Sequence, residues 1–406
     1  MRLLLSVMIV FASAGSLAAE IERGNFAACV SDLQSRALGQ GLDRSLVSDA
    51  LGAVEFQPRV IELDRDQPEF RQSFSAYLRA RVSEARVNRG RELLARHRGL
   101  LERLTREYGV PGHYLVSFWG METNFGSYLG TMPTLDSLAT LACDPRRSEF
   151  FTDELITALK LLEREGLTPE IMRGSWAGAM GHTQFMPSAY IRHAVDGDGD
   201  GKIDLWNSEV DALTSAANYL AGLGWQRGER WGREVRLPDD FPFQRSGLRN
   251  RAPLANWREL GVRRADGQPL PPADMQGSVI VPMGHRGPAF LVYDNFEVIM
   301  KWNRSQAYAI AVGHLADRIA GGGRLRADLP PVETAPSRSQ IERLQRGLIA
   351  QGFDPGEVDG AMGPATRAAL RAFQQAHGLV ADGYPGPDIL EALDTGMAAE
   401  QEQDSE

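Results

Sequence analysis

A glycine- and proline-rich segment at residues 321–337 divides the chain, because it contains Gly-Gly-Gly and Pro-Pro runs. Glycine is conformationally too free, and proline lacks a backbone donor, so such a segment does not form a packed helix or strand. We therefore predict a linker between a large folded part at 19–320 and a small one at 338–394. The acidic end of the chain, 395–406, is expected to be disordered.

The first residues are typical of an export signal. Arg2 precedes a short apolar run at 3–11, and Ser16-Leu17-Ala18 fits the small-x-small cleavage rule. We predict a signal peptide at 1–18, cut after Ala18. The apolar run is too short to cross a bilayer, and a retained signal anchor is the alternative. The mature protein is expected to be soluble in the periplasm, with no membrane anchor.

Composition narrows the class of partner. The chain has 43% hydrophobic and 24% charged residues, which is ordinary for a globular protein. Its net charge of -9 argues against nucleic acid, whose partners usually carry a basic surface. The charge does not exclude an anionic carbohydrate polymer, because sugars are bound through hydrogen bonds and aromatic faces. We expect a monomer that uses no organic cofactor.

The chain has two cysteines, Cys29 and Cys143. In an oxidising compartment the simplest interpretation is one disulfide between the N-terminal segment and the central part of the chain. Two buried thiols are the alternative.

Most of the large part is predicted to be helical. Within 25–224, segments such as 89–108 and 151–164 carry apolar residues at helical spacing with charges between them. A further helix is predicted at 296–319. The expected fold class is therefore mainly α.

A small β-rich insertion is predicted at 225–290. Proline and glycine become frequent there, and no long amphipathic pattern is present. Short apolar runs at 278–282 and 289–294 predict strands.

The C-terminal part contains an internal near-repeat. The stretch 358–364 (VDGAMGP) is echoed by 381–387 (ADGYPGP). Helices that open at Leu344-Gln345 and Phe373-Gln374 are predicted to precede the two Asp-Gly turns, where glycine accepts a positive φ. The pattern resembles the three-helix peptidoglycan-binding module of wall-lytic enzymes, and a generic three-helix spacer is the alternative.

A glutamate lies on an apolar helix face. The segment from Pro111 to about residue 124 predicts a helix in which Leu115, Phe118, Trp119 and Glu122 share one side. Burial favours the neutral form of a carboxyl group and raises its pKa. A neutral carboxylic acid can protonate a glycosidic oxygen, whereas an ion pair with arginine is the structural alternative.

Two blocks make the interpretation specific. The blocks 119–126 (WGMETNFG) and 174–188 (GSWAGAMGHTQFMPS) resemble the signatures of the membrane-bound lytic transglycosylase B family, glycoside hydrolase family 103. The resemblance covers about 26–320. It implies a lysozyme-like helical core and cleavage between N-acetylmuramic acid and N-acetylglucosamine, with Glu122 as the catalytic residue.

Further site residues follow from the same resemblance. It implies that Ser175 and Gln184 bind the sugars near the scissile bond, that Arg146 and Arg147 line the groove, and that further groove contacts come from Tyr219, Asn303 and Tyr308. Arginines suit the carboxylates of muramic acid and its peptide. Alternatives are a solvated helix start for the arginine pair and a core position for Tyr219. Trp302 stands where relatives carry tyrosine.

The implied mechanism uses one carboxylate. Ordinary glycosidases use two, whereas the family pattern supplies Glu122 alone. We expect Glu122 to protonate the leaving oxygen and then accept a proton from the muramoyl C6 hydroxyl as it attacks C1, which gives a 1,6-anhydromuramoyl end. A muramidase-type hydrolase and an inactive peptidoglycan-binding scaffold are the alternatives. Other cell-wall enzymes are candidate partners.

An acidic loop suggests calcium. The residues from Asp196 to Asp204 follow the start of an EF-hand loop, with candidate ligands Asp196, Asp198, Asp200 and the Lys202 carbonyl. Asn207 replaces the usual closing glutamate, and the family resemblance implies Asp211 as the closing ligand. A structural Ca²⁺ is expected, and an Asp/Gly turn without an ion is the alternative.

Overall fold

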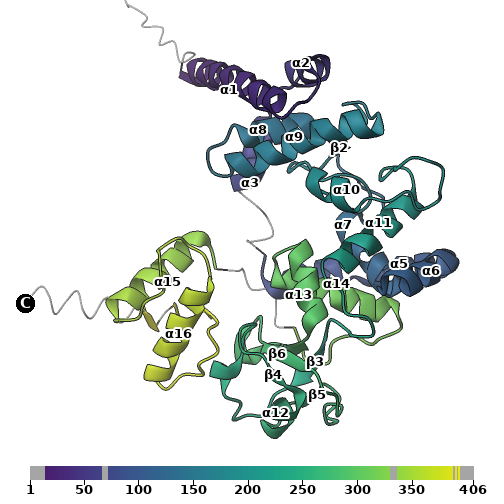
Figure 1. Ribbon diagram of the computed structural model, residues 1–406. Coiled ribbons are helices and arrows are strands. Elements are labelled where there is room, and N and C mark those ends of the chain that lie inside the picture. Colours follow the sequence, from purple (N-terminus) through teal and green to yellow (C-terminus); the bar gives the residue numbers. More distant parts are fainter. Residues whose placement is uncertain (1–13, 66–71, 330–335, 387–388, 391, 394–406) are drawn as a thin grey trace, which may run out of the picture. The chain divides into compact units, whose positions relative to one another are not determined.

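The computed structural model describes residues 14–65, 72–329, 336–386, 389–390 and 392–393, with side chains from Asn25 onward. It is mainly helical, with a small antiparallel sheet (Figure 1). The chain forms two units: unit 1 takes in Met1–Asp66 and Glu122–Tyr219, and unit 2 takes in Gln67–Met121 and Leu220–Glu406. No helix among the described residues is both long and apolar enough to span a bilayer. Most of the predicted signal peptide lies outside the described residues.

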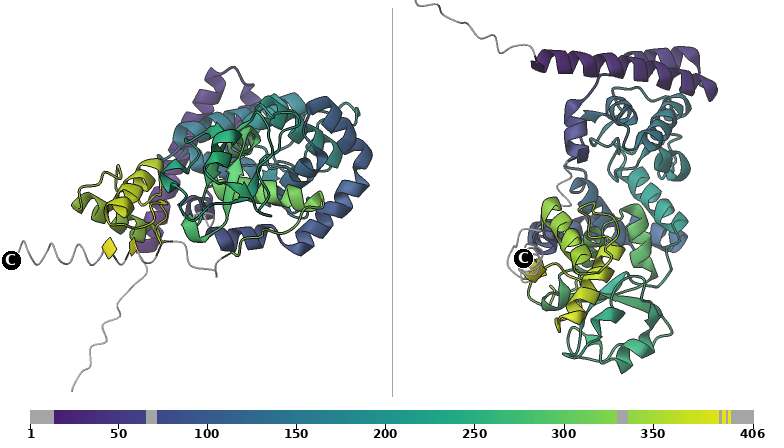
Figure 2. Two further views of the ribbon diagram at one scale, coloured as in Figure 1. Left: turned by 90° about the horizontal axis from the view of Figure 1, so that it is seen from below. Right: turned by 90° about the vertical axis from the view of Figure 1, so that its left-hand side faces the viewer.

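Unit 1 is built around a packed helical pair, α8 and α9, with α2 alongside α1 (Figure 2). Its elements are α1 (Ala14–Gly39), α2 (Arg44–Gly52), α3 (Pro58–Arg65), β1 (Met132–Pro133), α8 (Thr134–Ala142), α9 (Ser148–Glu165), β2 (Arg173–Gly174), α10 (Pro187–His193) and α11 (Glu209–Gly222), which runs on into unit 2. Apart from Asp136, the side chains of α8 are buried. Buried Glu154 of α9 accepts hydrogen bonds from the Ser188 backbone N–H and hydroxyl at 2.9 and 2.6 Å, which ties α9 to α10.

The structure contains a disulfide between Cys29 of α1 and Cys143 at the end of α8. This is the pairing expected from the sequence. The two residues are 114 apart in sequence, and cross-linking a loop of that length restricts the unfolded chain by on the order of 4 kcal/mol. The bond fixes the N-terminal helix to the central part of unit 1.

Unit 2 surrounds α14, which is buried along most of its length and contacts α4, α5 and α13. The Ser117 hydroxyl of α7 donates to the Val312 carbonyl of α14 at 2.7 Å. A side chain at Gly313 would collide with the Trp231 ring, so glycine permits the close approach there. Before the C-terminal module, the helices of unit 2 are α4 (Phe74–Arg81), α5 (Glu84–Arg96), α6 (Arg98–Tyr108), α7 (Gly112–Thr123, whose last two residues belong to unit 1), α12 (Leu254–Glu259), α13 (Asp294–Trp302) and α14 (Gln306–Ile319).

The predicted β-rich insertion contains a five-stranded antiparallel sheet in the order β4-β6-β7-β3-β5. The strands are β3 (Gly232–Arg236), β4 (Ala252–Pro253), β5 (Arg263–Arg264), β6 (Gln276–Ile280) and β7 (Ala289–Val292). Ser278 pairs with Val292, and Gly232 pairs with the same residue from the other side. The sheet packs on a core around fully buried Trp257. β6 and β7 lie where strands were predicted.

Two helical stretches of the sequence are interrupted in the structure, and one of them had been predicted as a single helix. The helical pattern over 89–108 corresponds to two helices, since His97 ends α5 and begins α6. The His97 ring instead contacts Trp119 edge-on, with centroids 5.8 Å apart. The helix predicted over 296–319 breaks before Ser305, whose hydroxyl accepts a hydrogen bond from the Tyr308 N–H and caps α14. Neither break contains the glycine or proline that would announce it.

The C-terminal module contains α15 (Arg338–Ala350) and α16 (Pro364–Ala376) around a shared apolar core. The helices begin six and nine residues earlier than predicted, because a Ser337–Gln340 capping box and Pro364 start them. The predicted third helix falls in a stretch that is only partly described. Each Asp-Gly turn is held by a buried glutamine: Gln345 donates to Asp359, and Gln374 donates to Asp382.

Candidate active site

Glu122 lies in the last turn of α7, and it is half-buried. The predicted apolar neighbours Leu115, Phe118 and Trp119 are buried. The other α7 side chains from Tyr114 to Met121 are buried as well. A helix that is apolar all round belongs to the interior of a fold. Glu122 is therefore a half-buried position on an otherwise buried stretch of helix, rather than one position on an amphipathic stripe. The raised pKa expected for Glu122 stays a prediction.

The backbone after Glu122 is in an unusual conformation. Asn124, Phe125 and Gly126 all have positive φ, at 49°, 61° and 76°. Among the described residues, the non-glycine positions with positive φ are Asn124, Phe125 and Gln184. Such conformations cost on the order of 1 kcal/mol or more each and persist where the surroundings enforce them. All three lie in the two signature blocks.

The glycine-rich block folds into a tight loop that presents Ser175 and Gln184. The Ser175 Oγ accepts hydrogen bonds from the N–H groups of Ala177 and Ala179, at 3.3 and 3.1 Å. Its own proton can therefore be donated to a ligand. The Gln184 Nε2 donates to the Leu129 carbonyl at 3.1 Å, so this side chain holds the loop that follows Glu122.

The two loops also meet through their glycines. A side chain at Gly130 would collide with the Gly174 carbonyl, directly before Ser175. Within unit 1, the loop that follows Glu122 is therefore packed against the block that carries Ser175 and Gln184.

The predicted arginine pair is engaged with a carboxylate that the sequence analysis missed. Arg146 and Arg147 both form salt bridges with Asp64 at the end of α3. Asp64 is only 4% exposed, whereas both arginines are partly exposed. The Arg147 guanidinium also lies over the Phe151 ring, 4.9 Å from its centroid. Two cations share one anion, so this cluster keeps a net positive charge.

The three remaining residues predicted to contact the substrate belong to different units. Tyr219 of unit 1 stacks on His193 with ring centroids 4.6 Å apart, and burial raises the pKa of its hydroxyl. Tyr308 of unit 2 is 4% exposed and packs near Phe118, with centroids 6.3 Å apart. The Asn303 Oδ1 accepts a hydrogen bond from the Ser305 N–H where α13 ends.

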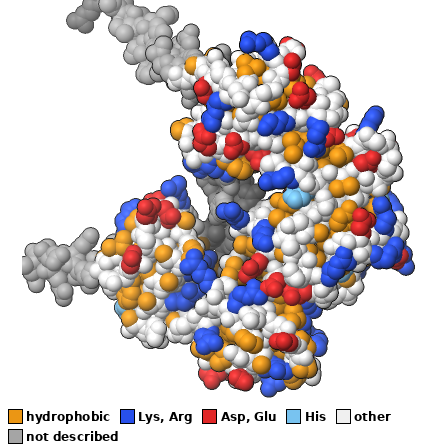
Figure 3. All heavy atoms as spheres, in the orientation of Figure 1, with side chains coloured by type: hydrophobic (Ala, Val, Ile, Leu, Met, Phe, Trp, Pro, Cys, Tyr) orange, Lys and Arg blue, Asp and Glu red, His pale blue; other side chains and the backbone are white. Residues whose placement is uncertain are grey.

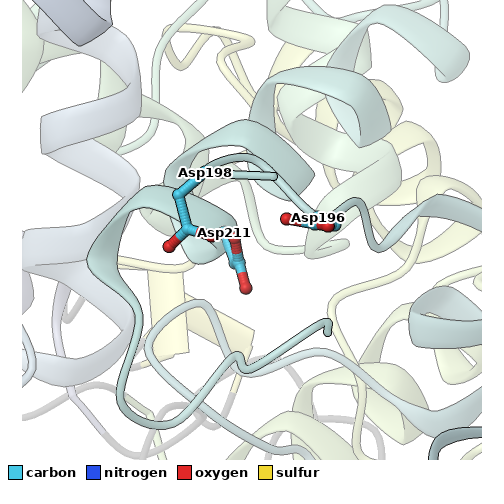
Figure 4. A group of neighbouring side chains, drawn as sticks. All are labelled: Asp196, Asp198 and Asp211. Carbon is cyan, nitrogen blue, oxygen red and sulfur yellow. The ribbon is translucent and has the colours of Figure 1, made fainter. Parts of the chain in front are cut away.

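Three of the predicted calcium ligands gather in one place (Figure 4). Asp196, Asp198 and Asp211 each place a carboxylate oxygen within 4.8 Å of the others. Asp211 is 1% exposed and accepts hydrogen bonds from the N–H groups of Gly197 and Asp204, both at 2.8 Å. Burial, and then the charges of Asp198 and Asp196, raise the pKa of Asp211. Crowded carboxylates of this kind fit a hard divalent cation, which would neutralise them.

Asp200 lies outside this group of three. Its carboxylate accepts a hydrogen bond from the Lys202 N–H at 2.9 Å. Asn207, at the usual position of the closing glutamate, donates from its side chain to Asp204 at 2.9 Å. The buried carboxylate comes instead from Asp211 on α11, as the family resemblance implied.

Sequence reasoning missed two kinds of residue. Asp64 carries no local motif, and only the tertiary fold brings it to the arginine pair. Thr123 and His182 both lie inside the signature blocks, but their contact joins positions 59 residues apart. Their positions inside the two signature blocks were the only sign in the sequence that these two residues belong to the site.

Comparison with known proteins places this site in a family. The chain matches the model described as "Transglycosylase SLT domain" over residues 25–317. It belongs to that family. Residues 337–393 match a second model, described as "Putative peptidoglycan binding domain". The family resemblance carried by the two signature blocks is thereby confirmed.

Several relatives are known by structure or by curated sequence. SltB3 from Pseudomonas aeruginosa, solved in complex with NAG-anhNAM-pentapeptide, is 46% identical with a TM-score of 0.87, over 91% of this chain and 99% of that chain. Escherichia coli Slt35, solved in complex with calcium, is 31% identical with a TM-score of 0.63. This match covers 72% of this chain and 92% of that chain. Membrane-bound lytic murein transglycosylase B of Escherichia coli (strain K12) is 35% identical over 261 residues, or 60% of this chain and 68% of that protein. The chain therefore has the lysozyme-like transglycosylase fold, followed by a peptidoglycan-binding domain.

Proposed function

We propose that this protein is a lytic transglycosylase that cleaves the β-1,4 bond between N-acetylmuramic acid and N-acetylglucosamine in peptidoglycan. The observation that carries the proposal is the position of Glu122. It lies in the last turn of the buried helix α7, and the loop that follows it contacts the glycine-rich block through Gln184 and through the close approach of Gly130 to Gly174. Membership of the transglycosylase family supports the same reaction class.

Glu122 acts first as an acid and then as a base. It gives its proton to the glycosidic oxygen while the bond from that oxygen to muramoyl C1 breaks. The C6 hydroxyl then attacks C1 and passes its proton to the Glu122 carboxylate, so no water is consumed and the product ends in a 1,6-anhydro ring. SltB3 has been solved with both NAG-NAM-pentapeptide and NAG-anhNAM-pentapeptide, which supports this product.

The remaining site residues hold the substrate. Ser175 and Gln184 supply neutral hydrogen-bonding groups next to the scissile bond, and Tyr219, Asn303 and Tyr308 extend the sugar contacts. Arg146 and Arg147 attract the carboxylates of the lactyl group and the peptide, since Asp64 neutralises only one of their two charges.

Asp196, Asp198 and Asp211 hold a structural calcium ion, which neutralises three crowded carboxylates and stabilises the loop. The Slt35 structure in complex with calcium supports the choice of metal. The ion takes no part in the bond cleavage that we propose.

The C-terminal module keeps the enzyme on the wall in the periplasm. Hydrophobic side chains are visible over its surface in Figure 3, and Ile349, Val358, Leu379 and Val380 are large hydrophobic residues that it exposes. Such residues suit contact with the apolar faces of sugars and peptide stems.

Mass spectrometry of fragments released from purified sacculi tests the proposal. The wild-type protein is expected to release anhydro-ended fragments, each one water lighter than its hydrolysed equivalent. Glu122→Gln is expected to release none, whereas Glu170→Gln, an exposed glutamate of unit 1, keeps wild-type activity. Reducing ends would identify a muramidase, and bound sacculi with no release by the wild type would identify a scaffold.

A further inference from the structure

The backbone directly after Glu122 has to be held in place by its surroundings. Asn124, Phe125 and Gly126 form a run of left-handed residues at the end of α7. A left-handed conformation is unfavourable for a residue with a side chain, so this run would relax without external contacts. The last turn of the helix, which carries Glu122, would then fray.

Thr123 is the buried link across this run. It is 2% exposed. Its hydroxyl donates to the His182 carbonyl at 2.8 Å and accepts a hydrogen bond from the Gly126 N–H at 2.9 Å. One side chain therefore joins the end of α7 to the glycine-rich block and also closes the left-handed turn.

The residue that accepts this hydrogen bond, His182, is held in place by contacts with Leu205 and with Gly126. The His182 N–H donates to the Leu205 carbonyl at 2.8 Å. A side chain at Gly181 would collide with that Leu205 carbonyl, and a side chain at Gly126 would collide with the His182 ring. The Thr123 hydroxyl is thus attached to a backbone segment that has little room to move.

The chain of contacts continues to the acidic loop. Asp204, the neighbour of Leu205, donates its N–H to the buried carboxylate of Asp211. All of these residues lie in unit 1. The anchor of Thr123 is therefore part of the same rigid loop system that presents Asp211.

We propose that Thr123 is a positioning residue for Glu122, acting through its hydrogen bond to the His182 carbonyl. The inference rests on the proposed function of Glu122. Without the Thr123 hydroxyl, the final turn of α7 loses its hydrogen bond to the His182 carbonyl of the glycine-rich block. The Glu122 carboxyl group then spends less time within hydrogen-bonding reach of the glycosidic oxygen. Misplacement by about 1 Å is enough to lower a rate by roughly 100-fold.

The test compares Thr123→Val, which is nearly isosteric but has no hydroxyl, with Thr123→Ser, which keeps it. Thr140→Val is the matched control, because Thr140 is also buried in unit 1 and its hydroxyl accepts a hydrogen bond from the Gln57 N–H at 3.0 Å. We expect Thr123→Val to lower kcat by roughly 10- to 100-fold, with KM within about twofold of the wild type. Thr123→Ser should recover kcat to within a few-fold. Thr140→Val should keep the wild-type kcat despite a comparable loss of thermal stability.

Three outcomes would overturn the proposal: an unchanged kcat in Thr123→Val, no recovery in Thr123→Ser, or a loss confined to KM. An equal loss of kcat in Thr140→Val would also overturn it, because the effect would then be one of general stability. Glu122→Gln is assayed alongside. Full activity of Glu122→Gln would refute the proposed role of Glu122, whatever Thr123→Val does.

Discussion

Two regions of this molecule use Asp-Gly sequences, and they satisfy the carboxylates in opposite ways. In the C-terminal module, Gln374 donates to Asp382 at 2.8 Å, and Gln345 donates to Asp359 at 2.9 Å. Hydrogen bonds from the Gln345 side chain and then the Ala361 N–H lower the pKa of Asp359. In the acidic loop of unit 1, Asp196, Asp198 and Asp211 crowd together instead.

The difference teaches that an Asp-Gly turn does not by itself make a metal site. In the module, a glutamine on the preceding helix is a neutral donor to the carboxylate of each turn, and Asp382 also contacts His285. In unit 1 the carboxylate of Asp211, on α11, lies beside those of Asp196 and Asp198, and burial raises the pKa of Asp211. A cation is the group that can resolve that crowding.

Removing calcium gives the largest expected effect. With calcium at about 1,000 times its Kd, binding adds about 4 kcal/mol to the free energy of unfolding. We expect excess chelator to lower the melting temperature of the wild type by several degrees, and Asp211→Asn to abolish the calcium-dependent rise. Scanning calorimetry with and without calcium measures both. Asp359→Asn is the control and should keep the full shift; an equal shift in Asp211→Asn would refute the site.

The next largest effect is expected from removing the Gln374 side chain, which holds the second Asp-Gly turn of the C-terminal module. Gln374 is 2% exposed, and its carbonyl oxygen accepts from the Gly383 N–H at 2.8 Å. Gln374→Leu leaves Asp382 and Gly383 without these partners, which should cost about 1–3 kcal/mol. Hydrogen exchange of peptides from α16 measures the loss.

The neighbouring Gln375 is exposed, so Gln375→Leu is the matched control and should change protection little. The loss in Gln374→Leu should be the same with and without calcium. A calcium-dependent loss would mean that the two regions are not independent.

A smaller effect is expected at Asp200. Because Asp200 lies outside the group of three carboxylates, Asp200→Asn should weaken calcium binding by less than about tenfold, or 1.4 kcal/mol. Asp198→Asn should weaken it more. Isothermal titration calorimetry compares the two variants, and the reverse order would show that the loop rearranges around the ion to use Asp200 as an EF-hand does.

The smallest effect is the acid sensitivity of the module. The pKa of Asp359 is lower in the folded protein than in the unfolded chain. Its ionised form therefore adds stability above about pH 4, and this stability is lost as the pH falls through the lowered folded value. Asp359→Asn should flatten that part of the pH dependence in hydrogen exchange of α15. An unchanged pH dependence in Asp359→Asn would show that the hydrogen bond from Gln345 does not stabilise the ionised carboxylate of Asp359.

The predictions from sequence succeeded where the signal was local. The pattern around β6 and β7 located strands, and the two signature blocks identified the family before any geometry was known. They failed for the helix predicted over 296–319, which is divided where Ser305 caps α14. The helical pattern over 89–108 is likewise divided at His97, whose ring packs against Trp119, a residue 22 positions away that periodicity cannot report.

What the sequence determined by itself is the inventory of chemistry: one glutamate in a strong motif, an acidic loop, two cysteines and a repeated Asp-Gly turn. The tertiary structure decided which of these groups meet. In the folded protein, Thr123 is hydrogen-bonded to His182 and Asp64 forms salt bridges with Arg146 and Arg147. The carboxylate of Asp211 lies beside that of Asp196. The physical reason is that burial and charge compensation depend on neighbours in space, and a pattern along the chain records only neighbours in sequence.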